Sequence, residues 1–319
     1  MQKNLTIKDI AGLNTDKNLF FIGEKHDEFA HHENQYQFIK TLYEEGRDLA
    51  IGLEQVQRPF QEYLDAYIAG DIDEAEMIRG TEYYSRWGFD FRLYKKIFDF
   101  AREKGISLVA LNLEAEITKM VSAKGINSLD EKYLAKIPTD IEYTTGHYMD
   151  RLKKIFMMHE SRRSFNNFYE AQLLWDETMA ESAAKYMQAN PEKTFVVIAG
   201  NGHLEYGYGI PDRVKRRTGA DYALVVQDMD YIDGIGDYIL YPEEMGCEAS
   251  PKMGVMVDET DDGLLVKKVF PDSIASGAGI EKGDYIIDFN GIEIFELDDI
   301  RLALMYAQKD KSYKFKVQS

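Results

Sequence analysis

Short apolar runs, each long enough for one buried strand, alternate with amphipathic helical stretches along the first two thirds of the chain. These runs are Leu19–Gly23, Leu49–Leu53, Ile106–Leu111, Phe195–Ala199 and Tyr222–Val226. Continuous apolar runs are typical of strands buried on both faces, and strands separated by helices favour a parallel sheet. We therefore expect an α/β fold in which helices flank a mostly parallel sheet.

Helices are predicted between these runs. The longest covers about 167–189, where Phe168, Trp175 and Met179 share an apolar row. A second covers about 91–104, and the stretch 59–79 is interpreted as a helical insertion. Spacings of three and four residues between apolar side chains support each of them.

The composition changes near residues 230–252, where glycine, proline and acidic residues collect as they do in a linker. Beyond this segment, short β-like runs surround one or two short helices, and Asn290-Gly291 is a strong signal for a tight turn. The sequence therefore predicts two domains, residues 1–245 and residues 250–319, the second smaller and rich in short strands.

The charge of the chain restricts its partners. Of 319 residues, 56 are acidic and 38 basic, and the net charge is −18. A negative field repels phosphate backbones and anionic lipids, so nucleic acid is not expected as the main partner. No apolar run approaches the roughly 18 residues of a spanning helix, so no transmembrane segment is predicted. A cytoplasmic location is expected if Met1 is the native start, and an exported or lipoprotein-anchored protein if a signal has been removed.

Polar residues follow the predicted strands at the points where the strands end. A Gly-x-x-His pattern occurs twice, ending in His26 and His203, with Glu24 beside the first and Glu54 after the second strand. Ligands of parallel α/β sheets bind beyond the carboxyl ends of the strands, so these four side chains are expected on one edge. Two imidazoles and two carboxylates suit Zn, Mn, Co or Fe.

The other histidines are interpreted as structural. His32 lies on the apolar row of its helix and is expected to pack, whereas His31 is expected to face solvent. His147 and His159 lie among charged residues and are predicted on the surface. The single cysteine, Cys247, excludes an intrachain disulfide and is interpreted as an incidental thiol.

Tyrosines near the second Gly-x-x-His motif offer further candidates. Tyr169, Gln172 and Asp176 share a face of the long predicted helix, which can line a pocket or face solvent, and the spacing leaves both open. Tyr206 and Tyr208 follow His203 closely, and loop tyrosines often only pack their rings.

A set of motifs spread over roughly residues 17–220 carries a resemblance. These are GEKHD, HHENQ, AIGLEQ, FYEAQLLWDETMAES and VVIAGNGHLEYGYGIP. In this order they resemble the ChaN-like haem-binding family of the Tiki superfamily. The wider superfamily includes erythromycin esterases and Tiki-type metalloproteases, which resemble this chain mainly in the two Gly-x-x-His motifs and the glutamate after the second strand.

The resemblance implies a haem-binding protein of iron uptake. In that family haems are held at a dimer interface, with tyrosine as iron ligand and histidine assisting, which implies a possible homodimer here. Tyr169 lies in the matched helix motif, and Tyr206 and Tyr208 lie in the matched glycine-rich loop. His26 and His203, together with the two glutamates named above, match the metal-site pattern of the superfamily.

The C-terminal segment resembles a bacterial PDZ domain of the type found in HtrA-like proteases. Lys252-Met253-Gly254-Val255 matches the carboxylate-binding loop, and VFPDSIA, AGIEKGDYI and FNG are further matching signatures. The resemblance implies a small PDZ-like β-barrel domain. It also implies that the C-terminus of a peptide or protein partner adds as a strand to the sheet edge.

Three hypotheses follow from the sequence. The first is a haem- or metal-binding protein whose PDZ module tethers it to a partner. The second is a metal-dependent hydrolase in which Glu24, His26, Glu54 and His203 hold a divalent ion such as Mn, Co or Zn that activates water. The third is an interaction scaffold whose first domain has lost its chemistry.

Overall fold

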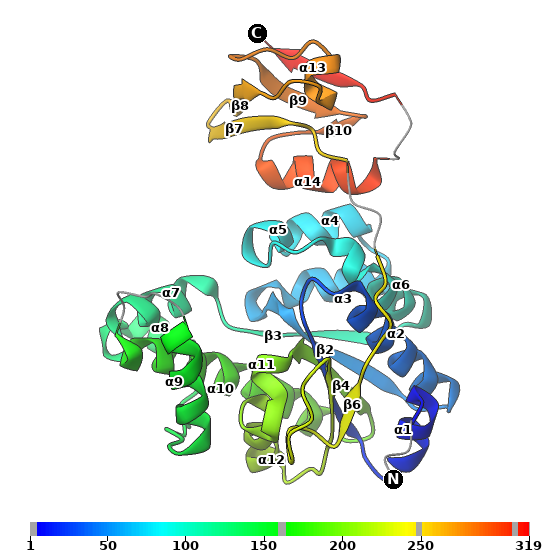
Figure 1. Ribbon diagram of the computed structural model, residues 1–319, viewed down its shortest axis with the longest axis vertical. Coiled ribbons are helices and arrows are strands. Elements are labelled where there is room, and N and C mark those ends of the chain that lie inside the picture. The colour runs from blue at the N-terminus through cyan, green and yellow to red at the C-terminus, as the bar shows by residue number, and fades with distance from the viewer. Residues whose placement is uncertain (1–4, 159–163, 247–250, 308–311, 319) are drawn as a thin grey trace. The chain divides into compact units, whose positions relative to one another are not determined.

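The computed structural model describes residues 5–158, 164–246, 251–307 and 312–318 (Figure 1). The chain divides into two compact units, one made of Met1–Ile72 with Leu93–Met245 and the other of Asp73–Arg92 with Gly246–Ser319. The sequence prediction assigned residues 73–92 to the first domain, whereas in the structure they pack with the C-terminal segment.

The first unit is built on a six-stranded parallel sheet with strand order β3-β2-β4-β1-β5-β6. Its strands are β1 Leu19–Glu24, β2 Leu49–Gln57, β3 Ser107–Asn112, β4 Thr194–Gly200, β5 Ala223–Gln227 and β6 Tyr238–Leu240. The predicted α/β architecture is confirmed. The sixth strand lies inside the segment predicted as a linker. Its three residues, Tyr-Ile-Leu, are too few to stand out among the glycine, proline and acidic residues around them.

Helices precede, separate and follow these strands. They are α1 Ile7–Leu13, α2 Phe29–Glu44, α3 Gln61–Ala69, α6 Lys95–Lys104, α7 Ala115–Lys124, α8 Glu131–Leu134, α9 His147–Met158, α10 Phe165–Ala189, α11 Asn201–Leu204 and α12 Ile210–Thr218. The helical stretch predicted over 59–79 is interrupted because Gly70 takes a left-handed conformation, with φ of 83°, at the end of α3. Among the residues described, none of the helices has the length and apolar character needed to cross a bilayer.

Consecutive side chains of β1 show how both faces of the sheet are covered. Phe21 belongs to a cluster that includes Met179 of α10 and Val214 of α12. The ring of Phe20, on the opposite face, lies 5.4 Å from the ring of Phe38 in α2. Adjacent residues of a strand point to opposite faces, so β1 is buried on both sides between the two layers of helices.

The second unit is an antiparallel five-stranded sheet with order β10-β9-β8-β7, in which β11 also pairs with β9. Its elements are α4 Glu74–Gly80, α5 Tyr83–Arg86, β7 Val255–Thr260, β8 Gly263–Val269, α13 Ile274–Gly277, β9 Tyr285–Phe289, β10 Ile292–Glu293, α14 Leu297–Tyr306 and β11 Phe315–Gln318. Its core is centred on Leu264, Val266, Ile286 and Phe289. The predicted small β domain is confirmed in this form.

Candidate functional site

The carboxyl ends of three neighbouring strands assemble the polar site of the first unit. In the sheet β4 lies between β2 and β1, and Glu24 of β1 is in register with Gly200 of β4. Glu54 lies on β2, His26 follows β1, and His203 lies on α11, which begins directly after β4. The structure thus brings the four predicted side chains to one edge of the sheet, because the strands are adjacent and parallel.

Glu24 holds His26. His26 Nδ1 lies 2.8 Å from Glu24 Oε1, and the Tyr94 hydroxyl donates to the same oxygen at 2.5 Å. Gln35 Nε2 donates to Glu24 Oε2 at 2.8 Å, and His32 Nδ1 lies 3.4 Å from it. Burial by itself would raise the pKa of Glu24, but these partners, His32 and His26 above all, lower it to about 2. Glu24 is therefore a carboxylate at neutral pH, although it is buried.

Asp176 holds His203 in the same way. His203 Nδ1 lies 2.6 Å from Asp176 Oδ1, and the Tyr148 hydroxyl donates to Asp176 Oδ2 at 2.6 Å. Burial alone would lower the pKa of His203, but the charges of Glu54 and Asp176 raise it to about 9. His203 is therefore an imidazolium at neutral pH, oriented by a buried aspartate.

Glu54 lies between the two histidines. Its Oε2 accepts the Gly200 N–H at 2.6 Å, and its Oε1 lies 3.4 Å from His203 Nε2. Burial lowers the pKa of His26, but the hydrogen bond to Glu24 and the charge of Glu54 raise it above its ordinary value. A Cβ at position 200 would lie 2.8 Å from His26 Cε1, so glycine is what lets the imidazole approach the strand. The imidazoles of His26 and His203, one on each side of Glu54, can therefore accept and donate protons.

The same groups do not assemble the predicted metal site. Within the part of the chain that the structure describes, no group of three or more His, Cys, Asp or Glu side chains is placed to hold a metal ion. Both oxygens of Glu24 are engaged by His26, Tyr94 and Gln35, so this carboxylate orients a histidine. A site for the Mn, Co or Zn ion of the sequence hypothesis is therefore not formed by these side chains in this arrangement.

The three tyrosines named by the sequence differ in their surroundings. Tyr169 is buried, and its hydroxyl donates to Thr144 O at 2.7 Å. Burial raises the pKa of Tyr169. Tyr206 and Tyr208 are half-buried and stack with ring centroids 5.2 Å apart, and Tyr208 also stacks on the exposed His147 at 6.2 Å. Parallel, partly exposed rings of this kind suit contact with a flat porphyrin, and phenol and imidazole groups suit ferric iron.

The sequence did not decide whether the helix face with Asp176 lines a pocket or faces solvent, and it gave no indication that Tyr94 and Tyr148 belong to the site. Asp176 is buried against His203, so its helix face lines the site. Tyr94 lies 70 residues from Glu24 in the chain, and no local pattern connects the two. Tyr148 is 28 residues from Asp176, and the packing of α9 on α10 places its hydroxyl beside that carboxylate.

The predictions for the other histidines have mixed outcomes. His32 is buried beside the Tyr94 ring, as predicted, and His147 is exposed. The prediction for His31 is wrong: it is fully buried, its Nε2 lies 2.9 Å from Asp228 Oδ2, and its Nδ1 accepts the Lys25 N–H. The loop after β5 covers this face of α2, which the helical period alone does not indicate. The predictions for His159 and Cys247 concern residues outside those described.

The loop before β7 presents backbone N–H groups at an open sheet edge. Gly254 has φ of 77°, and a Cβ there would lie 2.2 Å from Ser273 Cβ, so only glycine fits. Met253 O accepts the Ala275 N–H, and Gly254 O accepts the Phe270 N–H. Across trans peptides the following N–H groups, those of Gly254 and Val255, point the other way. Among the described strands, β7 pairs only with β8, so its second edge is open.

Two family models match the chain. The one described as haem-binding uptake, Tiki superfamily, ChaN matches residues 12–214, and that of the PDZ domain matches residues 251–318. The first of these matches therefore covers more than half of the chain.

Individual proteins are more distant. ChaN of Campylobacter jejuni, whose structure is described as showing cofacial heme binding, is 18% identical with a TM-score of 0.60, and the match covers 75% of this chain and 92% of that one. A mutant of the erythromycin esterase EreC is 14% identical with a TM-score of 0.41, over 70% and 74% of the two chains. Protein RETICULATA-RELATED 5, chloroplastic, of Arabidopsis thaliana is 26% identical over 203 residues, 59% of this chain but only 27% of its own length. The likeness to the Campylobacter protein shows the fold.

Proposed function

Because the chain belongs to the ChaN-like haem-binding uptake family of the Tiki superfamily and carries a PDZ domain, we propose that it binds haem through its first unit and a protein C-terminus through its second. The observation that carries the haem proposal is the half-buried stack of Tyr206 and Tyr208, which follows the charged His203 in the chain. Haem is the cargo of such a protein, and the chain supplies its ligands.

Tyr206 or Tyr208 is the expected iron ligand. A phenolate is a suitable axial ligand for ferric haem. Tyr169 is the weaker candidate, because its hydroxyl is occupied by Thr144 O and burial raises its pKa, which opposes ionisation. His203, oriented by Asp176, supplies a positive charge close in the chain to Tyr206 and Tyr208.

Titration with haemin tests this proposal. Tyr206→Phe or Tyr208→Phe should weaken binding by at least about ten-fold, as loss of a metal ligand or its support does. Tyr169→Phe is the matched control and should change the affinity less than about two-fold. A weak, non-saturating Soret band in the unmodified protein would exclude haem as the ligand. Sedimentation of the loaded protein tests whether two copies share their haems.

The PDZ proposal depends on the loop at Gly254 and on the open edge of β7. A peptide whose terminal carboxylate meets the N–H groups of Gly254 and Val255 would add antiparallel to β7, with main-chain hydrogen bonds giving the affinity. Amidation of the peptide C-terminus should therefore abolish binding. Equal affinity for the free acid and the amide would contradict the proposal.

A hydrolase is the second candidate, and the two histidine–carboxylate pairs around Glu54 favour it. Protonated His203 can donate a proton to a leaving group, while His26, oriented by Glu24, accepts one from water. Turnover of p-nitrophenyl acetate with chelator present tests it, and added Mn, Co or Zn tests the metal-dependent form. His26→Ala and His203→Ala should each lower kcat by about 100-fold or more. Unchanged rates in both variants would remove this candidate, and absence of haem binding as well would favour the scaffold hypothesis.

A further inference from the structure

The side chains along the open edge of β7 change from apolar to acidic between its start and its end. Val255 and Val257 are half-buried and pack on the core of the second unit, as does Leu304 of α14. Two residues further along the same face, Glu259 Oε1 accepts the N–H of Leu297 at the start of α14. Alternate residues of a strand share a face, so this face is apolar near Gly254 and acidic at its far end.

Carboxylates concentrate at that far end. Three cations in the region are already paired: Lys267 with Asp258, Arg301 with Asp298 and Arg79 with Asp299. Within the described part of the chain, four further carboxylates there have no basic partner, those of Glu259, Asp261, Asp262 and Glu296. Glu296 has its pKa raised by burial and by the charges of Asp299, Asp298, Glu259 and Glu82. Glu259 and Glu296 therefore act on each other through their charges, and Asp261 and Asp262 follow the end of β7 in the chain.

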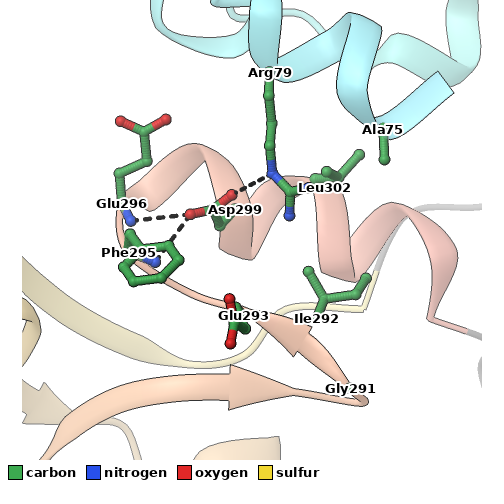
Figure 2. A pocket seen from close by; sticks show the side chains of 9 residues that line it. All are labelled: Ala75, Arg79, Gly291, Ile292, Glu293, Phe295, Glu296, Asp299 and Leu302. Carbon is green, nitrogen blue, oxygen red and sulfur yellow. Dashed lines mark hydrogen bonds and ion pairs between the residues drawn. The ribbon is translucent and has the colours of Figure 1, made fainter. Parts of the chain in front are cut away.

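A pocket of about 510 Å³ lies at the start of α14 and includes one aromatic side chain. It is lined by residues of α4 and of the segment from β10 into α14 (Figure 2). Figure 2 shows Asp299 directed at Arg79, whereas the carboxylate of Glu296 points away from that pair. Phe295, which is 69% exposed, lies next to it in the chain. A lysine or arginine side chain could meet a carboxylate and a ring together at such a place.

The opposite end of the edge carries positive charge. Lys252 lies in the loop before β7, and Lys268 lies on β8 opposite Met256, and both lysines are exposed. The edge therefore runs from positive, at the N–H groups of Gly254 and Val255, to negative around Glu259. This gradient is the complement of a peptide with a free carboxylate and basic residues upstream.

We propose that the partner of this edge is a protein C-terminus with an apolar last residue and basic residues at the fourth to sixth positions from its end. The positions follow from the register. A strand that starts with its carboxylate at Gly254 and runs antiparallel to β7 advances roughly 3.3 Å per residue, so these positions pair with Asp258–Thr260. The inference rests on the proposed peptide-binding function and names its partner class.

Fluorescence anisotropy with the full-length chain tests the inference. Labelled decapeptides ending in Ala-Val with a free carboxylate would carry lysine, serine or glutamate at the fourth to sixth positions from the end. Exposed ion pairs are individually weak, so the lysine peptide should bind about five-fold more tightly than the serine peptide, which corresponds to about 1 kcal/mol. The preference should shrink at high salt because the charges are exposed.

The double variant Glu259→Gln, Glu296→Gln should reduce the preference for the lysine peptide over the serine peptide to less than about two-fold. Glu281→Gln is the matched control, an exposed acid in the loop before β9, two strands away from β7. Thermal melting of each variant shows that it is folded.

The outcomes distinguish the preference for basic residues from the peptide binding on which it depends. Carboxylate-dependent binding with equal affinity for the lysine and glutamate peptides would overturn the basic preference and leave the PDZ function standing. Binding that ignores amidation, or no binding by any of the peptides, would overturn both.

Discussion

Two buried acids, Glu24 of β1 and Asp176 of α10, favour the protonated forms of two histidines. Each carboxylate receives hydrogen bonds from a histidine and a tyrosine: Glu24 from His26 and Tyr94, and Asp176 from His203 and Tyr148. Burial acts against every charge in this set, and the partner charges more than offset it for Glu24 and His203. The site therefore keeps separated charges in a largely water-free place, which is typical of functional sites.

Removing the charge of Asp176 should lower the pKa of His203 from about 9 toward its ordinary value of 6.5. Asp176→Asn keeps the shape but loses the charge that favours the imidazolium. An NMR titration of the His203 ring measures the midpoint. Tyr148→Phe is the control, because it removes only a hydrogen bond to Asp176 and should shift the midpoint less. An unchanged midpoint in Asp176→Asn would contradict this account.

The same pKa shifts predict how stability depends on pH. His203 has a raised pKa, so its contribution is complete below pH 6.5 and is lost as the pH rises through about 9. Glu24 has a lowered pKa, so its contribution is complete above pH 4.5 and is lost as the pH falls through about 2. For His203 the loss is about 3 kcal/mol. Urea unfolding across this pH range should show it, and Asp176→Asn should flatten the alkaline side.

Gly200 is expected to tolerate no side chain. In Gly200→Ala the new Cβ would lie 2.8 Å from His26 Cε1 and 3.7 Å from Glu54 Oε2, and the imidazole must move. Overpacking of this kind costs about 1–3 kcal/mol. Urea unfolding and the NMR signal of His26 should both change. Gly12→Ala is the control, since no atom lies within 4 Å of its Cβ, and it should not lower stability.

At the scale of the elements, the sequence predicts where strands and helices lie along the chain better than it predicts which of them contact one another. The centres of five strands and the extent of α10 follow from apolar periodicity, because burial on both faces leaves continuous runs. The sequence could not show what faces Asp176 on α10, because its partners come from two other helices, Tyr148 of α9 and His203 of α11. β6 could not be found, since it has only three residues and lies within a segment whose composition is that of a linker.

One buried acid of α10, Glu177, makes ion pairs with three arginines of α12. Its carboxylate contacts Arg213, Arg216 and Arg217, and Arg213 is also buried. Removing one partner of a buried ion pair leaves an uncompensated charge and costs about 3–5 kcal/mol. Glu177→Gln should therefore lower the free energy of unfolding by that amount in a urea titration.

The matched control lies one turn further along the same helix. Glu181 pairs with Arg58 and Lys185 near the surface, and Glu181→Gln should cost less than about 1 kcal/mol. Similar losses in the Glu177 and Glu181 variants would show that the buried ion pairs of Glu177 contribute no more than those of Glu181.

At the scale of the whole molecule, the two units are interleaved along the chain. Residues 73–92 lie between α3 and α6 of the first unit, yet they pack with the second. Arg79 Nε donates to Asp299 at 2.8 Å, and the Tyr84 hydroxyl lies 3.5 Å from Met305 Sδ, so α4 and α5 both contact α14. The sequence could not indicate this, because apolar patterning shows that a face is buried and not which segment covers it.

The segment 246–319 alone should therefore be less stable than it is within the chain. Leu302 and Met305 are 1% and 9% exposed, and both lie outside the core cluster centred on the strands of the second unit. Without residues 73–92 their side chains would face water, and burial of such side chains contributes about 1.5–3 kcal/mol each. A net loss of about 2 kcal/mol would speed hydrogen exchange in α14 by about 30-fold. Exchange measured on the fragment and on the full chain gives the comparison, with β9 as the internal reference because Ile286 and Phe289 keep their own cluster. Equal protection of α14 in the fragment and in the full chain would mean that the C-terminal segment is equally stable without α4 and α5.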